Sequence, residues 1–144
     1  MVNGLTFSVS SQVKVIDFGS TCFEGNTFFS YIQSRHYRAP EVILGLPYTC
    51  AIDMWSFGCV IAELLVGIPI FPGENEYNQL AKIIEMVGMP PTEMLDRGSK
   101  TKKFFRREEL PTGGHRYVLR DPAEFCEENN IPFAENRRYH SLHT

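Results

Sequence analysis

Apolar side chains surround almost the whole circumference of one predicted helix, which runs from Asp53 to Val66. Asp53 is suited to cap its first turn, and Gly67 followed by Pro69 ends it. A helix that is apolar nearly all round belongs in the interior of a larger fold. The pattern therefore predicts a buried, central helix.

A second helix is predicted over 76–87 by a narrower apolar stripe. Its apolar positions follow the i, i+3, i+4, i+7 spacing that places side chains on one helix face. These positions are Leu80, Ile83, Ile84 and Val87. Gly88 and the pair Pro90-Pro91 end the pattern, so this helix is expected to cover a core with one side only.

The outer parts of the chain carry weaker patterns. Leu5–Val9 and Val13–Ile16 alternate apolar and polar positions, which predicts two short strands that pair as an antiparallel hairpin. A long loop is expected from 20 to 34, one or two helical turns at 92–96, and a short acidic helix at 121–129. The predicted fold class is mainly α with a short β-hairpin.

Composition and charge narrow the class of protein. Among 144 residues, 43% are hydrophobic and 22% are charged, which excludes wholesale disorder and is enough for one domain. A net charge of −3 argues against a protein whose main task is to coat nucleic acid. No apolar run approaches the ~18 residues of a membrane span, and residues 1–6 have no secretion leader. We expect a soluble protein of the cytoplasm, the nucleus or both, with no nucleic-acid or membrane partner.

The four cysteines and four histidines show no ligand spacing for a metal. The cysteines are expected to be reduced, partly buried thiols. None of the histidines is assigned to a metal site.

Three short motifs carry the chemical information, and they follow one another in a fixed order. Asp17-Phe18-Gly19 comes directly after the second predicted strand; a carboxylate there can hold Mg²⁺ against ATP phosphates, and the glycine lets the loop reorient. Arg38-Ala39-Pro40-Glu41 comes next, and Asp53-Met54-Trp55-Ser56-Phe57-Gly58 opens the apolar helix. A strand followed by DFG, a loop, APE and DxWxxG at these spacings is a signature with few false matches.

This signature resembles the C-lobe of a eukaryotic protein kinase, from the metal-binding strand through helices F and G. The run 31–41 is similar to the activation segment of the Dyrk family, the dual-specificity tyrosine-regulated kinases. Other segments are most similar to its Yak-type branch, with the homeodomain-interacting kinases as second choice. These segments are 45–48, 51–59, 67–73, 76–80, 124–126 and 129–131.

The resemblance covers residues 12–140 and implies an incomplete kinase C-lobe. It divides the partial kinase domain 1–144 into three parts. They are the DFG-to-APE activation segment at 12–41, a helix F and G region at 42–97, and a truncated insert of this kinase group at 98–144.

The resemblance also implies roles for the residues around the first motif. Asp17 is the expected Mg²⁺ ligand and binds the ATP cofactor through the metal. Ile16 is expected to line the floor of the adenine pocket. Phe18 is the spine residue behind the metal ligand, and Gly19 completes the motif.

Tyr31 matches the tyrosine that members of the family phosphorylate on themselves. A phosphate there adds about two negative charges, which Arg35 and Arg38 can clamp. Phe29 stands where many relatives have the first tyrosine of a Tyr-x-Tyr pair, so one site remains. An ordinary loop aromatic and two surface arginines are the open alternatives.

The remaining motif residues are expected to be structural: Ala39, Pro40, Glu41, Asp53, Trp55 and Gly58. By family analogy Asp53 hydrogen-bonds the backbone of the catalytic loop, with a plain helix cap as its alternative. Glu41 pairs in relatives with an arginine late in the C-lobe, and neither Arg137 nor Arg138 is assigned to that role.

A basic cluster lies within the predicted insert. It consists of Lys100, Lys102, Lys103, Arg106 and Arg107. Such a run can bind a partner or act as a nuclear address, and its alternative is an ordinary solvated surface.

Several parts of a working kinase do not occur in these residues. They are a Gly-rich loop, a strand lysine with its partner glutamate, and the HRD loop with the catalytic Asp. The resemblance implies phosphoryl transfer from ATP to serine and threonine of protein substrates, together with tyrosine autophosphorylation. The hypothesis for the isolated chain is that it is inactive and exposes the apolar surface of its central helix. The alternative is a non-catalytic, kinase-derived binding module, and the oligomeric state is left open.

Overall fold

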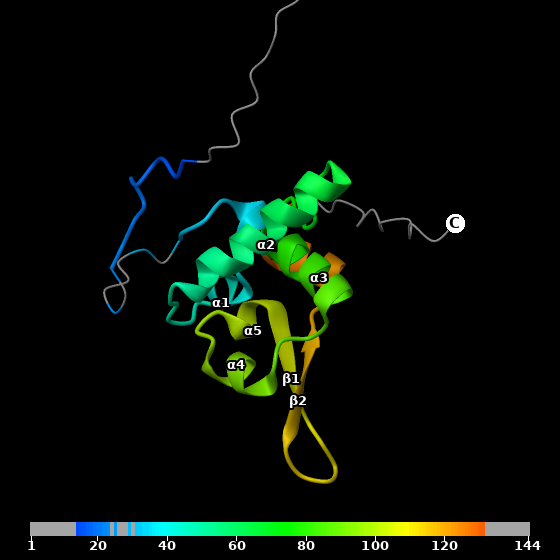
Figure 1. Cartoon of the computed structure of the whole chain (residues 1–144). Coiled ribbons are helices and arrows are strands. Elements are labelled where there is room, and N and C mark those ends of the chain that lie inside the picture. Colours follow the sequence, from blue (N-terminus) through cyan, green and yellow to red (C-terminus); the bar gives the residue numbers. More distant parts are fainter. Residues whose placement is uncertain (1–13, 24, 26–28, 30, 132–144) are drawn as a thin grey trace, which may run out of the picture.

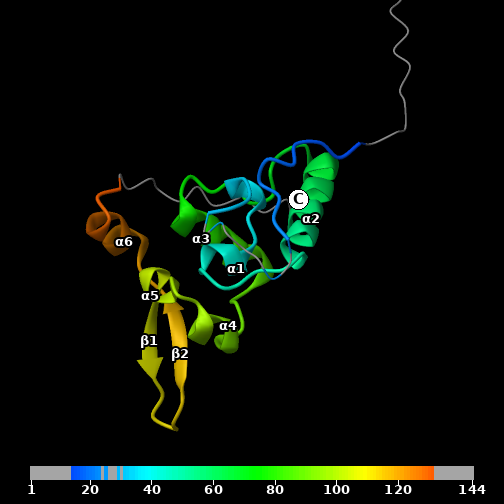
Figure 2. The same cartoon turned by 90° about the vertical axis from the view of Figure 1, so that its left-hand side faces the viewer.

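The computed structural model describes residues 14–23, 25, 29 and 31–131, and this part of the chain is mainly helical (Figures 1 and 2). The elements in chain order are the 3₁₀ helix η1 (Arg35–Tyr37), α1 (Pro40–Ile43), α2 (Ala51–Val66), α3 (Glu76–Val87), α4 (Thr92–Arg97), α5 (Thr101–Phe104), β1 (Phe105–Glu109), β2 (His115–Leu119) and α6 (Pro122–Glu128). The predicted class, mainly α with a short β-hairpin, is confirmed. Within the described residues no helix has the length and hydrophobicity of a membrane span.

The hairpin does not lie where it was predicted. Residues 14–16 form no strand, and Val15 and Ile16 are each 79% exposed. The prediction was wrong there because a strand needs a neighbouring strand for its backbone groups, and the part of the chain described by the structure places none beside it. Val13 and the predicted strand 5–9 lie outside the described residues.

The observed hairpin joins β1 to β2 in antiparallel register, from Phe105 opposite Leu119 to Glu109 opposite His115. It projects from the helical body in both views (Figures 1 and 2). Asp96 of α4 anchors it, because its carboxylate accepts a hydrogen bond from the Tyr117 hydroxyl at 2.8 Å.

Helix α2 begins two residues before the predicted cap. Its N-cap is Cys50, which makes no side-chain cap bond, so the capping role predicted for Asp53 is wrong. The Thr49 hydroxyl accepts a hydrogen bond from the Ala51 N–H at 3.3 Å, which places Asp53 inside the first turn. The predicted end is confirmed: Gly67 has a φ of 85° and donates to the Glu63 carbonyl at 2.7 Å.

Helix α3 has the predicted bounds and buries Leu80 and Ile83 of its apolar stripe in the core, whereas Val87 at its end is 62% exposed. Asn75 caps it, since its side-chain oxygen accepts from the Asn78 N–H at 2.8 Å. The short helices predicted at 92–96 and 121–129 are α4 and α6.

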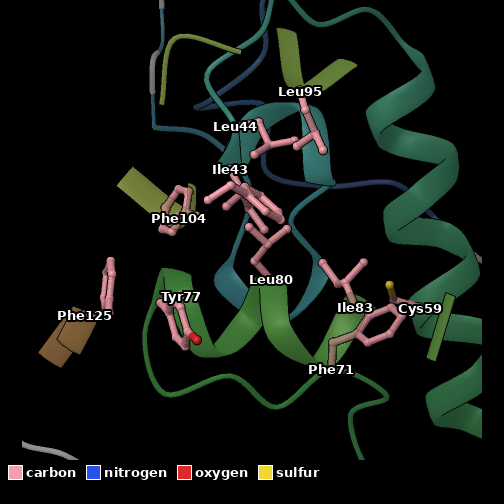
Figure 3. Close-up of a cluster of buried hydrophobic side chains, with 11 residues drawn as sticks. Ile43, Leu44, Cys59, Phe71, Tyr77, Leu80, Ile83, Leu95, Phe104 and Phe125 are labelled. Carbon is pink, nitrogen blue, oxygen red and sulfur yellow. The ribbon is translucent and has the colours of Figure 1, made fainter. Parts of the chain in front are cut away.

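The core is centred on α3 and gathers side chains from six other helices and strands and from the connecting segments at Leu44 and Phe71 (Figure 3). We call it the central core. It consists of Ile43, Leu44, Cys59, Phe71, Tyr77, Leu80, Ile83, Leu95, Phe104, Phe105 and Phe125. A second, smaller cluster under the activation segment contains Ala39, Val42 and Ile52, and Trp55 packs against both clusters.

Helix α2 lies at the edge of the molecule and buries only one narrow stripe (Figure 2). Ile52 and Cys59 are buried, and Trp55, Ser56, Ala62 and Glu63 are half-buried beside them. We call the opposite side the outer face of α2. It consists of Met54, Phe57, Val60, Ile61, Leu64 and Leu65, which are between 42% and 82% exposed. The prediction of a buried, central helix is therefore wrong for the part of the chain that the structure describes, because nothing in it covers the outer face. The expected exposed apolar surface of this helix is confirmed.

Candidate functional site

The Asp17-Phe18-Gly19 motif lies in an exposed turn. Asp17 has a φ of 64°, which is an unusual conformation for a residue with a side chain, and its carboxylate faces the Gly19 N–H at 3.4 Å. Phe18 is 67% exposed, and Ile16 is as exposed as Val15. The structure therefore brings neither Ile16 nor Phe18 against the central core.

A pocket of about 290 Å³ joins the first and third motifs. Asp17 and Asp53 both line it, together with residues of the loop and of the start of α2. Two of the predicted site carboxylates are thus brought to one cavity. The described residues contain no group of three or more His, Cys, Asp or Glu side chains that would complete a metal site.

Tyr48 forms part of the wall of this pocket. Its hydroxyl donates to the Phe29 carbonyl at 3.1 Å and lies 3.8 Å from the Cys22 sulfur. Burial raises the pKa of Tyr48, and the neighbouring Cys22 thiol adds to the effect. These contacts tie the loop after the first motif to the segment before α2.

Gln33 fastens the activation segment to α2, and sequence reasoning missed it. Its amide nitrogen donates to the Ile52 carbonyl and to the Ser56 hydroxyl, each at 2.7 Å. Its amide oxygen accepts from the Ala39 N–H at 2.9 Å. No local pattern marks this residue, because its partners lie up to 23 positions away.

Two further bonds hold the same segment. Ser56 donates from its hydroxyl to the Tyr37 carbonyl at 2.8 Å, and the Tyr37 hydroxyl donates to the Glu63 carboxylate at 2.7 Å. This bond to Glu63 raises the pKa of Tyr37. The activation segment therefore covers Ser56 and Glu63, the half-buried polar side chains of α2.

Arg38 is a buried charge, 1% exposed, and its guanidinium is held by the backbone of the same segment. Nε donates to the Ile32 carbonyl at 2.9 Å, and Nη2 donates to the Gln33 carbonyl at 2.8 Å. Nη1 faces the Glu76 carboxylate at 3.5 Å. A buried charge needs such partners, so Arg38 fixes the path of residues 32–38.

Tyr31 is brought to the two predicted clamp arginines. Its ring stacks on Arg38, with the guanidinium carbon 3.9 Å from the ring centre. Hydrogen bonding to Arg38, followed by its charge and a smaller effect of Arg35, lowers the pKa of the Tyr31 phenol. Arg35 itself is exposed and donates to the Glu74 carbonyl at 2.5 Å. Tyr31 is 62% exposed and so remains accessible.

The other motif residues occupy structural positions. Ala39 is fully buried, Pro40 is in the first turn of α1, and Glu41 is half-buried beside it. Trp55 stacks on Phe71, with ring centres 5.7 Å apart. Gly58 faces open space on α2.

Four cations of the basic cluster lie near acidic side chains of the chain, and Lys100 and Lys103 share one carboxylate. Lys103 lies 3.3 Å and Lys100 lies 3.9 Å from the Glu76 carboxylate. Arg106 pairs with Glu124, and Arg107 pairs with Glu109. Those cations therefore already have acidic partners on the same molecule.

Comparison with protein families gives a match to the protein kinase domain over residues 3–112. That range contains all three motifs and ends within the hairpin.

Three curated relatives show how close the similarity is. The chain is 50% identical over 131 residues to the dual specificity protein kinase YAK1 of Saccharomyces cerevisiae, covering 89% of this chain and 16% of that protein. It is 52% identical over 130 residues to the serine/threonine-protein kinase ppk15 of Schizosaccharomyces pombe, covering 90% and 24%. It is 56% identical over 101 residues to the dual specificity tyrosine-phosphorylation-regulated kinase 3 of Mus musculus, covering 70% and 17%. The chain thus spans less than a quarter of each relative.

Proposed function

This chain belongs to the protein kinase family, in the group of Dyrk and Yak-type kinases, and from that premise we propose that it is part of an ATP-dependent, dual-specificity kinase. The proposed reaction transfers the γ-phosphoryl group of ATP to serine and threonine hydroxyls of protein substrates, and to Tyr31 of the chain itself. The observation that carries the proposal is the match of 89% of this chain to a relative named as a dual specificity protein kinase. The mainly helical architecture with one two-stranded sheet is that of an incomplete kinase C-lobe.

Protein kinases generally use ATP and Mg²⁺. The residues of this chain fit one part of that requirement, a carboxylate ligand for Mg²⁺. Mg²⁺ is usually bound by one or two carboxylates together with substrate phosphates. Asp17 would supply one such carboxylate, since it lines the pocket of about 290 Å³ at the start of α2. In this proposal a Mg²⁺ ion held by Asp17 would neutralise charge on the transferred phosphoryl group, and Ile16 would meet the adenine ring in the complete domain.

Tyr31 is the proposed acceptor of the tyrosine phosphorylation. The phosphoryl group passes from ATP to the Tyr31 hydroxyl oxygen, the hydroxyl proton is lost and ADP leaves. Arg38 already touches the ring, and its charge favours the anionic product. Gln33 supports this arrangement, because it holds the segment between Tyr31 and Ala39 on α2.

We infer that the 144 residues alone are inactive. They contain no Gly-rich loop, no strand lysine with its glutamate and no HRD sequence. Kinases stabilise the transition state mainly by positioning and by charge, and these are the parts that supply both.

Two experiments test the proposal. Sequencing the full transcript from its 5′ end is expected to extend the reading frame through an HRD loop and a strand lysine; a message that begins at Met1 would instead support the non-catalytic binding module. The complete natural protein is then assayed for transfer of labelled phosphate from Mg²⁺-ATP to protein serine and threonine. Asp17→Asn is expected to abolish transfer, whereas Glu93→Gln, an exposed acidic change on α4, is expected to leave it intact. Equal activity of the two variants would contradict the role of Asp17.

The Tyr31 site is tested by mass spectrometry of the same protein. We expect a phosphopeptide containing Tyr31 in the wild type and none in Asp17→Asn expressed without another kinase. A phosphopeptide of equal abundance in both would show that another enzyme modifies Tyr31.

We also propose that the protein resides in the cytoplasm, the nucleus or both. We interpret the basic cluster as a solvated surface rather than a nuclear localisation signal, because Lys103, Arg106 and Arg107 have acidic partners within the chain. Replacing Lys102 and Lys103 by glutamine is expected to leave the distribution of a fluorescently tagged protein unchanged. Loss of a nuclear fraction would contradict this assignment.

A further inference from the structure

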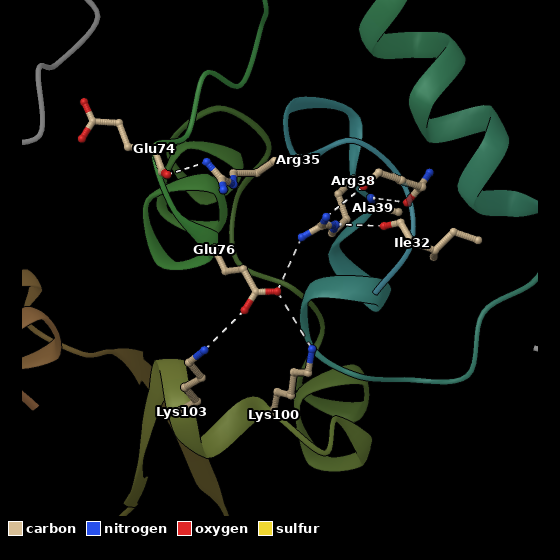
Figure 4. A network of polar contacts seen from close by, with 9 residues as sticks. Ile32, Arg35, Arg38, Ala39, Glu74, Glu76, Lys100 and Lys103 are labelled. Carbon is tan, nitrogen blue, oxygen red and sulfur yellow. Dashed lines mark hydrogen bonds and ion pairs between the residues drawn. The ribbon is translucent and has the colours of Figure 1, made fainter. Parts of the chain in front are cut away.

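Glu76, the first residue of α3, gathers three cations from distant parts of the chain (Figure 4). Its Oε1 lies 3.5 Å from Nη1 of Arg38 and 3.9 Å from the Lys100 amine. Its Oε2 accepts from the Lys103 amine at 3.3 Å. One carboxylate thus connects the activation segment with the basic cluster at the start of the hairpin.

The contact between Glu76 and Arg38 is an ion pair without a hydrogen bond. Nε and Nη2 of Arg38 are satisfied by backbone carbonyls, but Nη1 is buried and has no hydrogen-bond partner among the residues that the structure describes. A buried guanidinium donor without an acceptor is costly. Nη1 can therefore take a better acceptor while Arg38 keeps its hydrogen bonds to the Ile32 and Gln33 carbonyls, and only the ion pair with Glu76 is given up.

The local charge balance fits a phosphate. Arg38, Lys100 and Lys103 carry three positive charges around the single negative charge of Glu76. Arg35 adds a fourth cation, which its hydrogen bond to the Glu74 carbonyl holds two positions from Glu76 along the chain. A phosphate of about −2 on Tyr31 would use this surplus, but it would also lie near the Glu76 carboxylate and be repelled by it.

We propose that Glu76 is the resident counter-anion of Arg38 and competes with a phosphate on Tyr31, and that Lys103 is a positioning residue that holds Glu76 away from it. This inference rests on the proposed phosphorylation of Tyr31. The phosphate takes Nη1 of Arg38, and Glu76 passes to Lys103 and Lys100. The strength with which the phosphate is held therefore depends on a residue of the basic cluster that never touches it.

The test uses the complete natural protein with phosphotyrosine introduced at position 31 during translation, so that it does not depend on autophosphorylation. Excess tyrosine phosphatase removes the phosphate, and the first-order rate constant reports how firmly it is held. Glu76→Gln keeps the shape and removes the competing charge, so dephosphorylation should be about threefold slower. An unchanged or faster rate would overturn the proposal.

Lys103→Gln is expected to act in the opposite direction. It releases Glu76 toward Arg38, so dephosphorylation should be about threefold faster. A merely structural role for the cluster predicts that both single variants loosen the segment and that both speed the reaction. A rate for Lys103→Gln that is unchanged or slower would therefore also overturn the proposal.

A double variant separates the two possible actions of Lys103. If it acts through Glu76, Glu76→Gln with Lys103→Gln reacts at the rate of Glu76→Gln alone. A faster rate means that Lys103 acts on the phosphate directly, which overturns its assigned role. Lys102→Gln is the matched control, because Lys102 is an exposed lysine of the same short helix, and its rate should equal that of the wild type.

Failure of the proposed function is detected separately. If the unmodified natural protein never carries phosphate on Tyr31, the proposed autophosphorylation is wrong. The rate constants of the wild type and the four variants, measured with introduced phosphotyrosine, still show whether Glu76 competes with the phosphate.

Discussion

The central core and the outer face of α2 are built from the same kinds of residue but meet opposite surroundings. In the central core, Leu80 and Phe104 are fully buried. On the outer face, Phe57 is 57% exposed and Leu64 is 76% exposed. Hydrophobicity alone therefore does not decide which side of a helix packs in this chain.

The polar contacts explain which side of α2 is turned inward. Its buried stripe contains Ser56 and Glu63, which bond to Tyr37 and Gln33 of the activation segment. Ile52 and Trp55 pack on this inward side, whereas Phe57, Leu64 and Leu65 are left on the opposite side. A contiguous exposed apolar surface of this kind usually marks a protein–protein interaction site.

The largest expected difference between the two regions comes from a matched pair of phenylalanines. Phe104→Ala removes a fully buried ring and should cost about 3–5 kcal/mol of the free energy of unfolding, because Phe104 packs against Phe125 at 6.0 Å between ring centres. Phe57→Ala should change it by less than about 0.5 kcal/mol. Urea unfolding of the 144-residue chain, followed by circular dichroism, measures both. A similar loss for Phe57→Ala would show that the outer face is covered in solution, and sedimentation would then reveal self-association.

Alkaline pH should destabilise the central core through Tyr77, which is 4% exposed and donates to the Arg120 carbonyl. Burial, with smaller effects of Asp121 and Cys126, raises its pKa to about 12. The folded state holds this proton more tightly than the unfolded state, whose pKa is about 10. The stabilisation is thus complete below about pH 10 and is lost as pH rises toward 12, by roughly 2–3 kcal/mol.

Urea unfolding as a function of pH checks this expectation. Tyr77→Phe should remove the largest single part of the alkaline loss, since Tyr37 and Tyr48, whose pKa values are also raised, account for smaller parts. Tyr31→Phe is the control and should retain it, because the pKa of Tyr31 is lowered and its titration has the opposite sign. The assignment to Tyr77 would be wrong if Tyr77→Phe lost as much stability as the wild type.

Two glycines should respond to alanine with opposite signs. A Cβ at Gly73 would lie 2.5 Å from backbone atoms of Gln79 in α3, so Gly73→Ala should cost about 1–3 kcal/mol. A Cβ at Gly58 meets nothing within 4 Å, and Gly58→Ala in the interior of α2 should stabilise the chain by about 0.5–1 kcal/mol. The midpoints of thermal unfolding give both signs. A destabilising Gly58→Ala would mean that this side of α2 is packed.

The sequence predicted α3 well because its local signals agree. One apolar stripe, Gly88 and two prolines all point to the same helix at 76–87. The strand predicted at 13–16 lacked such support, since a strand depends on a distant partner that a local pattern does not contain.

Only part of the candidate site could be predicted from the sequence. The spacing of Tyr31, Arg35 and Arg38 predicted that they would meet, and the structure places Arg38 on the ring of Tyr31. The roles of Gln33 and Glu76 were not predicted. Both act through contacts between residues distant in the chain, such as Glu76 with Arg38, and neither belongs to a recognisable motif.

The smallest expected effects concern the two helix starts, where sequence reasoning chose Asp53 as a cap and overlooked Asn75. Asn75→Ala removes the bond to the Asn78 N–H and should cost about 1 kcal/mol, whereas Asn75→Asp keeps an acceptor and should restore most of it. Asp53→Ala should cost less than about 0.5 kcal/mol at high salt, because this exposed side chain only adds charge near the first turn. Urea unfolding of the three variants side by side measures the difference. Equal costs for Asn75→Ala and Asp53→Ala would show that α2 begins at Asp53 in solution and that its N-terminus is organised as the sequence predicted.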